Sequence, residues 1–158
     1  MKDRTPSTDL PRLGDIGLVN YPPYLMNRIM GRYNASLRSE MMALGLTIPK
    51  MRALAVLSVV DGLLISQLAV YAIVEQSTLS RALDALQADG LILRQTDADD
   101  SRATRVSITD AGRAAFESLW PSMAETYARM FRGIPAAEQD AFVATLQKVH
   151  ANIRKHDF

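Results

Sequence analysis

Apolar side chains recur at steps of three and four residues in the first part of the chain, a spacing that predicts amphipathic helices. The first such stretch covers residues 24–45. The second covers residues 47–61, and Thr47 is a suitable N-cap for it. The preceding residues 1–20 carry prolines, a glycine and mixed charges without a clear period, which indicates a mobile arm.

Two shorter helices are expected next. One covers residues 63–72, with Ser66 as its expected cap, and the other covers residues 74–90 and stops at Gly90. The second of them has a single apolar stripe, formed by Leu79, Ala82, Leu83 and Leu86. Its opposite face is therefore left to polar residues and solvent.

The period then changes from helical spacing to alternation. Residues 91–96 and 104–109 predict two strands. Residues 97–103, which connect them, are too many for a tight hairpin turn, so this loop is expected to project from the strand pair.

Helical spacing returns after the sequence Thr-Asp-Ala-Gly, residues 109–112, which is typical of a helix start. A long helix follows with Pro121 inside it, where a bend is expected. A break near residue 134 separates it from a last helix. Both helices have apolar stripes, and residues 47–109 are too few to cover them as well as the first helix.

The order of these elements indicates a mainly α-helical chain with a small β-wing, an α+β arrangement. Residues 47–109 read as a winged helix-turn-helix, whose second short helix can lie in a DNA major groove. Hydrogen-bonding residues occupy the start and outward face of that helix: Gln76, Ser77, Thr78, Ser80 and Arg81. The alternative is a solvated face on which Ser77 or Thr78 merely caps the helix.

The projecting loop adds a second set of candidate DNA contacts. Arg102 and Arg105 lie beside the acidic residues Asp99 and Asp100. A narrow minor groove attracts a guanidinium group, and a carboxylate two residues earlier can hold Arg102 in place through charge-assisted hydrogen bonds. The alternative is an ordinary exposed ion pair without function.

Composition narrows the function. The chain has 158 residues, 48% of them hydrophobic, a net charge of +1 and no cysteine. Bulk charge therefore does not indicate a nucleic-acid partner, and disulfides and thiolate chemistry are excluded. Without an apolar signal core or a membrane-length apolar run, a cytoplasmic protein is expected. With no glycine-rich phosphate loop, and with His150 and His156 on different helix faces, we expect no enzyme activity, cofactor or metal site.

Residues from about 24 to 155 resemble the MarR family of bacterial transcriptional regulators. The resemblance rests on Leu68-Ala69, then "STLSRALDALQADGLILR", then "DDSR" and "SITDAG", in this order and at the family's spacing. It implies that Ser77, Thr78, Ser80 and Arg81 meet the major groove and its phosphates. It also implies that Arg94 lies near the DNA backbone, that Arg102 enters the minor groove, and that Asp100 braces Arg102.

One position departs from the family pattern. The family commonly has glycine in the turn between the two short helices, whereas this chain has Ile73. A β-branched residue is costly at positive φ, so we expect the turn to differ in shape.

The resemblance also implies a homodimer, in which residues 21–46 and 110–158 form the dimerisation region. Twofold symmetry would then present two recognition helices to a pseudo-palindromic operator. The function expected is a repressor released by a small organic ligand. The alternative is a winged-helix module that binds protein and not DNA.

Small ligands in this family commonly bind between the dimer helices and the winged domain. The first helix carries arginines and tyrosines without an intervening acid, and the candidate ligand residues are Tyr24, Arg28, Arg32 and Tyr33. Such a set suits an anionic organic molecule, with or without an aromatic ring. The alternatives are a basic face exposed to solvent, or arginines paired with acids elsewhere in the chain.

Overall fold

The computed structural model describes residues 11–157, which fall into two compact units that divide between Ser36 and Leu37. The first unit contains α1 (Leu13–Ile16), the short 3₁₀ helix η1 (Leu18–Asn20) and α2 (Pro22–Ser36). Residues 13–16 and 18–20 of the predicted arm form helical turns, and the mobility of the arm stays a prediction. Residues 1–10 of that prediction lie outside the described residues.

The single helix predicted over residues 24–45 is two helices. α2 ends at Ser36, whose hydroxyl donates a hydrogen bond of 2.8 Å to the carbonyl of Tyr33. A serine side chain that occupies a backbone acceptor in this way competes with the next turn of helix. Leu37 is fully buried, and a second helix, α3 (Arg38–Ala43), begins directly after it.

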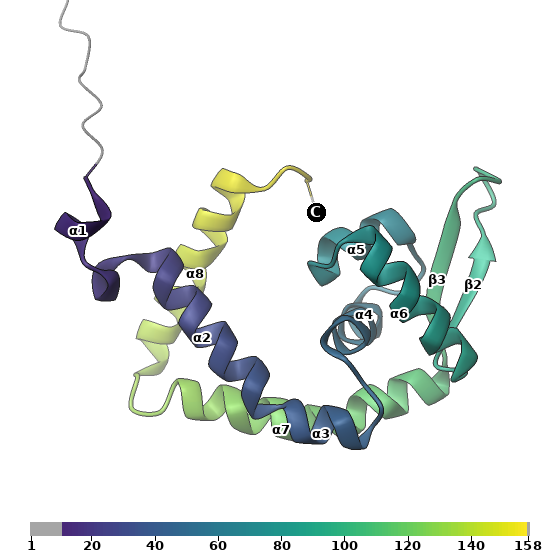
Figure 1. The fold of residues 1–158 in the computed structure, drawn as a ribbon, viewed down its shortest axis with the longest axis horizontal. Helices are drawn as coiled ribbons and strands as arrows, with labels where there is room; N and C mark the ends of the chain where they lie inside the picture. The colour runs from purple at the N-terminus through teal and green to yellow at the C-terminus, as the bar shows by residue number, and fades with distance from the viewer. Residues whose placement is uncertain (1–10, 158) are drawn as a thin grey trace, which may run out of the picture. The chain divides into compact units, whose positions relative to one another are not determined.

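The second unit contains the remaining elements. In chain order they are α3, α4 (Ile48–Val59), β1 (Leu63–Leu64), α5 (Ile65–Ala72), α6 (Gln76–Ala88), β2 (Ile92–Thr96), β3 (Thr104–Ile108), α7 (Asp110–Met130) and α8 (Ala136–Ile153). In Figure 1 the β2–β3 hairpin projects beside α6, as the alternating pattern predicts. No helix in the described part of the chain is long and apolar enough to cross a membrane.

The sheet has a third strand that the sequence pattern missed. β1 pairs with β3, and β3 pairs with β2, all antiparallel. β1 is only two residues long and continues directly into α5, so its leucines are indistinguishable from a helix start in the sequence. Ser66 is not the cap predicted for α5: Leu64 occupies the N-cap, and its N–H donates to the Gln67 side-chain oxygen at 3.0 Å.

Leucines from three helices build the core of the second unit. α4 packs against both α5 and α6, and α6 also packs against β2. The stripe predicted on α6 is buried as expected, with Leu79, Leu83 and Leu86 fully inaccessible. Because burial of each such side chain contributes about 1.5–3 kcal/mol, this stripe fixes which face of α6 points outward.

The predicted start of α7 joins three segments. The Thr109 hydroxyl accepts the Gly112 N–H at 3.0 Å and donates to the Gly90 carbonyl at 2.7 Å, so it caps α7 and ties it to the end of α6. A Cβ atom at Gly112 would lie 2.0 Å from the carbonyl oxygen of Leu91. Only glycine permits this approach, which anchors α7 beside the wing.

The turn between α5 and α6 keeps the left-handed conformation that glycine would adopt, contrary to the expectation of an altered shape. Ile73 has φ 55° and ψ 52° and is 78% exposed. Its N–H donates to the end of α5, and its carbonyl accepts Arg52 Nη1 at 3.1 Å. These bonds hold the turn although a β-branched residue is disfavoured there.

Replacing Ile73 by glycine is expected to raise the free energy of unfolding by about 1 kcal/mol, because glycine removes the left-handed strain and the exposed side chain buries little surface. Chemical denaturation at fixed protein concentration measures the change. Ile73→Ala is the matched control, since alanine also loses the large side chain but keeps the strained Cβ. Equal effects of both variants would show that backbone strain at this turn is negligible.

Candidate nucleic-acid interface

At the N-terminal end of α6, the side chains on the outward face neither cap the helix nor pack in the core. Gln76, Ser77 and Thr78 are exposed, and Ser80 is half-buried. The N-cap is Glu75, and no side chain caps the helix, so the capping role considered for Ser77 or Thr78 is not observed. The first N–H groups of a helix without a side-chain cap are available to phosphates or other acceptors.

The arginines predicted to contact DNA fall into two classes. Arg81, on α6, is exposed and has no ion-pair partner among residues 11–157. Arg94, on β2, instead turns toward α6: its Nη2 lies 2.7 Å from Asp84 Oδ1, and its Nε donates to Gln87. Arg94 therefore ties the wing to α6, the helix that the sequence pattern predicts to be the recognition helix.

Arg105 is engaged in a similar way. Its Nε donates to the Asp97 carboxylate, and its Nη1 donates to the Gly62 carbonyl at 2.7 Å. Gly62 precedes β1 and Asp97 follows β2, so Arg105 connects both outer strands from its place on β3. Like Arg94, it is committed to contacts inside the domain.

Arg102 is the arginine that the wing presents outward, with 90% of its side chain exposed. Its Nε lies 3.3 Å from Asp100 Oδ1, and the same oxygen accepts its backbone N–H at 3.0 Å. The contact between Asp100 and Arg102 thus has the geometry expected from the sequence. The carboxylate uses only the Nε edge, so both terminal nitrogens of Arg102 remain available.

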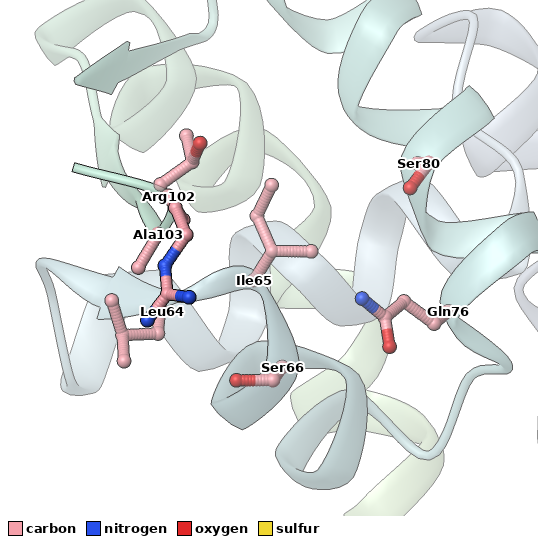
Figure 2. A pocket seen from close by; sticks show the side chains of 8 residues that line it. Leu64, Ile65, Ser66, Gln76, Ser80, Arg102 and Ala103 are labelled. Atoms are coloured by element: carbon pink, nitrogen blue, oxygen red, sulfur yellow. The ribbon is translucent and has the colours of Figure 1, made fainter. Parts of the chain in front are cut away.

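A hollow of about 320 Å³ lies between the recognition helix and the wing. Figure 2 shows Gln76 and Ser80 on one side of it, Arg102 on the other and Ser66 below. Leu64, Ile65, Ala103 and Thr104 complete the lining. The hollow therefore places polar side chains of α5, α6 and the wing around one concave surface.

The carboxyl group of Asp97 is held in its charged form. The backbone N–H groups of Asp100 and Asp99 donate to it at 2.9 and 3.0 Å, and together with Arg105 they lower its pKa below the ordinary value, with the bond from Asp100 contributing most. Burial opposes this shift without reversing it. The loop that carries Arg102 is thus built around a buried anion.

The predicted ligand residues lie in the first unit, on α2. Arg28 Nη1 donates to the Tyr24 hydroxyl at 2.8 Å, and the Arg28 guanidinium lies 5.7 Å from the Tyr24 ring centroid. Arg32 follows one turn later and is exposed. Tyr33 is half-buried, and burial raises the pKa of its hydroxyl above the ordinary value.

Solved structures of other proteins share the fold of this chain. A crystal structure of a MarR family transcriptional regulator from Silicibacter pomeroyi is 59% identical and superposes with a TM-score of 0.89, covering 94% of this chain and all of the other. The chain belongs to the MarR family. The family profile itself matches residues 44–103, which include the helix-turn-helix and most of the wing.

Two further relatives of this MarR protein differ more in sequence. The HTH-type transcriptional repressor IacR of Pseudomonas putida is 27% identical over 134 residues, which cover 85% of this chain and 80% of the repressor. BpsR of Bordetella bronchiseptica, whose DNA binding is regulated by 6-hydroxynicotinic acid, is 24% identical with a TM-score of 0.70, covering 81% of this chain and 97% of BpsR. MarR proteins are transcriptional regulators, which favours regulation over the interaction-module alternative.

Sequence reasoning missed the inner partners of the arginines in this MarR domain. Asp84 and Gln87 are three residues apart on α6 and share the Arg94 side chain. Their spacing places both on one helix face, but nothing in the sequence reveals that β2 runs past that face. Asp97 carried a weak signal, since an acid directly after a strand often accepts backbone N–H groups in the following turn.

Stability should depend on pH through Asp97. A carboxyl whose folded pKa is lowered stabilises the folded state above its unfolded pKa, and this contribution is lost as the pH falls through the folded value. The difference in unfolding free energy between wild type and Asp97→Asn should therefore be largest near neutral pH and shrink in acid. Urea denaturation across pH measures it, with Asp99→Asn as control. A difference that is independent of pH would contradict this assignment.

Proposed function

We propose that this MarR protein is a homodimeric, sequence-specific repressor that binds double-stranded DNA through α6 and the wing and is released by an anionic organic ligand. The observation that carries the proposal is the hollow between Gln76 and Ser80 on α6 and Arg102 on the wing. A helix in the major groove and an arginine in the adjacent minor groove have one sugar-phosphate strand between them. The hollow has the concave shape and the polar lining that would bind this strand.

Within this proposal the outward residues divide the work of recognition. Arg81 can grip a guanine edge with two parallel hydrogen bonds, while Ser77, Thr78 and Ser80 reach bases or phosphates. Arg102 enters the minor groove, where the potential is most negative in narrow A·T-rich sequence. Asp100 restrains the Arg102 side chain before binding, which reduces the rotamer freedom lost in the complex.

A second copy of the chain is the proposed partner of the exposed apolar faces. No residue of α8, which the structure describes throughout, is buried. Its large exposed side chains are Phe142, Val143, Leu146, Val149 and Ile153, and α2 exposes Leu25, Met26, Ile29 and Met30. Faces of this size are normally covered by another subunit. A twofold axis would set the two recognition helices about 34 Å apart, one turn of DNA.

The arginines should separate into base-reading and groove-reading residues. On a duplex selected from a random pool, Arg81→Ala should cost about 1–3 kcal/mol of binding free energy and relax base preference. Arg102→Ala should weaken binding most at sites with A·T-rich flanks, and Asp100→Ala should reproduce part of that loss. Fluorescence anisotropy titrations at several salt concentrations measure these effects.

Arg132→Ala is the matched control for these titrations. Arg132 follows α7, so the length of that helix separates it from the wing, about 30 Å at 1.5 Å per residue. It should have little effect at moderate salt, because charges beyond a Debye length are largely screened. Tighter binding by Asp100→Ala would instead identify this acid as a repulsive neighbour of the phosphates.

The row of Tyr24, Arg28 and Arg32 at four-residue spacing on α2 is the proposed ligand surface. Two guanidinium groups one helical turn apart can bind a carboxylate or phosphate, and the tyrosine ring can pack on an aromatic ligand. Tyr33 adds a protonated hydroxyl on the next position. BpsR is regulated by 6-hydroxynicotinic acid, an anionic aromatic acid, which is consistent with this chemistry. BpsR itself shares only the fold with the present chain.

An anionic aromatic acid should therefore weaken DNA binding. With 6-hydroxynicotinate as probe, Arg28→Ala and Arg32→Ala should blunt the release while leaving ligand-free DNA affinity unchanged. The uncharged amide of the same ring is the matched ligand control. If the amide releases DNA as well as the acid, the anionic class is wrong. Loss of DNA binding by the variants without ligand would assign these arginines to phosphates or to the dimer.

A further inference from the structure

Asp97 differs from the other acids of the wing. It lies directly after β2, and only 6% of its side chain is exposed, whereas Asp99 and Asp100 are exposed. Burying a carboxylate is costly unless hydrogen bonds and an opposite charge compensate. Such a residue has a defined task in the fold, and its contacts identify that task.

The carboxylate of Asp97 organises the loop from inside. Oδ1 accepts the backbone N–H groups of Asp99 and Asp100, and Oδ2 accepts Arg105 Nε. The Asp97 N–H donates to the Ala103 carbonyl, and the Ala103 N–H donates to the Asp100 carbonyl, both at 2.9 Å. Asp97 therefore closes the loop across its base and sets the backbone of Asp100.

Asp100 in turn holds Arg102 through its own carboxylate, at 3.0 Å from the backbone N–H and 3.3 Å from Nε. On the other side, Arg105 ties Asp97 to Gly62, beside β1. The contacts thus run without interruption from the sheet to the exposed arginine. We propose that Asp97 and Arg105 are positioning residues for Arg102, and that the Asp97–Arg105 pair orders the wing before it meets DNA.

This inference rests on the proposed DNA-binding function and reassigns Arg105, which the sequence pattern placed among the DNA contacts. A loop that is ordered in advance does not lose its conformational entropy on binding. Without the buried anion, Arg105 loses its charged partner, and the N–H groups of Asp99 and Asp100 keep only a weaker, neutral acceptor. The loop must then be ordered in part by the DNA itself. Arg102 would then enter the minor groove with lower affinity.

Two isosteric variants of the full chain separate positioning from charge. Asp97→Asn and Asp99→Asn each remove one negative charge from the same loop, but the Asp99 side chain has no hydrogen-bond partner in the described part of the chain. If charge alone matters, both variants should bind a selected duplex slightly tighter, because repulsion from phosphates falls. The proposal expects Asp97→Asn to bind about tenfold more weakly, the size of one lost charge-assisted hydrogen bond, and Asp99→Asn to bind no more weakly than wild type.

A double-mutant cycle tests whether the effect passes through Arg102. In an Arg102→Ala background, Asp97→Asn should have little further effect on affinity, and the loss in the single variant should be largest at A·T-rich flanks. An equal loss with and without Arg102 would overturn the proposal, since Asp97 would then act on the domain as a whole. A change in DNA affinity of the same sign and size in Asp97→Asn and Asp99→Asn would also overturn the proposal.

Amide hydrogen exchange in the free protein gives a readout that needs no DNA. Asp97→Asn should accelerate exchange at the N–H groups of Asp99 and Asp100 and leave α4 protected. Arg105→Gln, which keeps the Asp97 carboxylate, should accelerate hydrogen exchange at the same two N–H groups. This variant replaces Asp97→Asn in the experiment if Asp97→Asn does not fold. Unchanged exchange in both variants would overturn the proposal. If exchange is accelerated in the variants but the wild-type protein binds no duplex, only the DNA-binding function is refuted.

Discussion

The apolar stripe of α6 is the constraint on which the interface depends. Leu79, Leu83 and Leu86 are fully buried against α4, α5 and β2. α6 has a single apolar stripe, so burying that stripe determines the direction of every other side chain on the helix. Ser77, Ser80 and Arg81 need no packing role as a result, and their positions are set by leucines that never meet a ligand.

Charge is distributed by the same logic. The net charge of the chain is only +1, so its attraction for a polyanion depends on which cations are left unpaired at the surface. Arg94 and Arg105 are neutralised by Asp84 and Asp97 and connect elements of the domain. Arg81 is exposed without an ion-pair partner in the described part of the chain, and Arg102 stays 90% exposed although it pairs with Asp100. Acids within the wing thus define the exposed basic surface, because Asp97 holds Arg105 within the domain and Asp100 contacts the exposed Arg102.

Periodicity was sufficient to predict α4, α6 and the β2–β3 hairpin, and the Thr-Asp-Ala-Gly motif predicted the start of α7, because each of these depends on local sequence. It failed where the outcome depends on distant partners. β1 exists only through its pairing with β3. The break after Ser36 has a local cause instead, a serine hydroxyl that bonds a carbonyl of its own helix, and apolar periodicity does not register it. The sequence predicts DNA contacts for both Arg94 and Arg102, and only the course of β2 past α6 shows that Arg94 is held by Asp84 instead.

The contacts that hold α6, the wing and α7 together limit the ways in which a ligand could change DNA binding. α6 is tied to the wing by Arg94, and the wing is tied to α7 by Thr109 and by the close approach at Gly112. A ligand that distorted this assembly would have to break several of these contacts. In the proposed dimer, changing the separation of two intact assemblies breaks none of them. A weakly bound effector can supply only a few kcal/mol of differential affinity, which favours the change in separation.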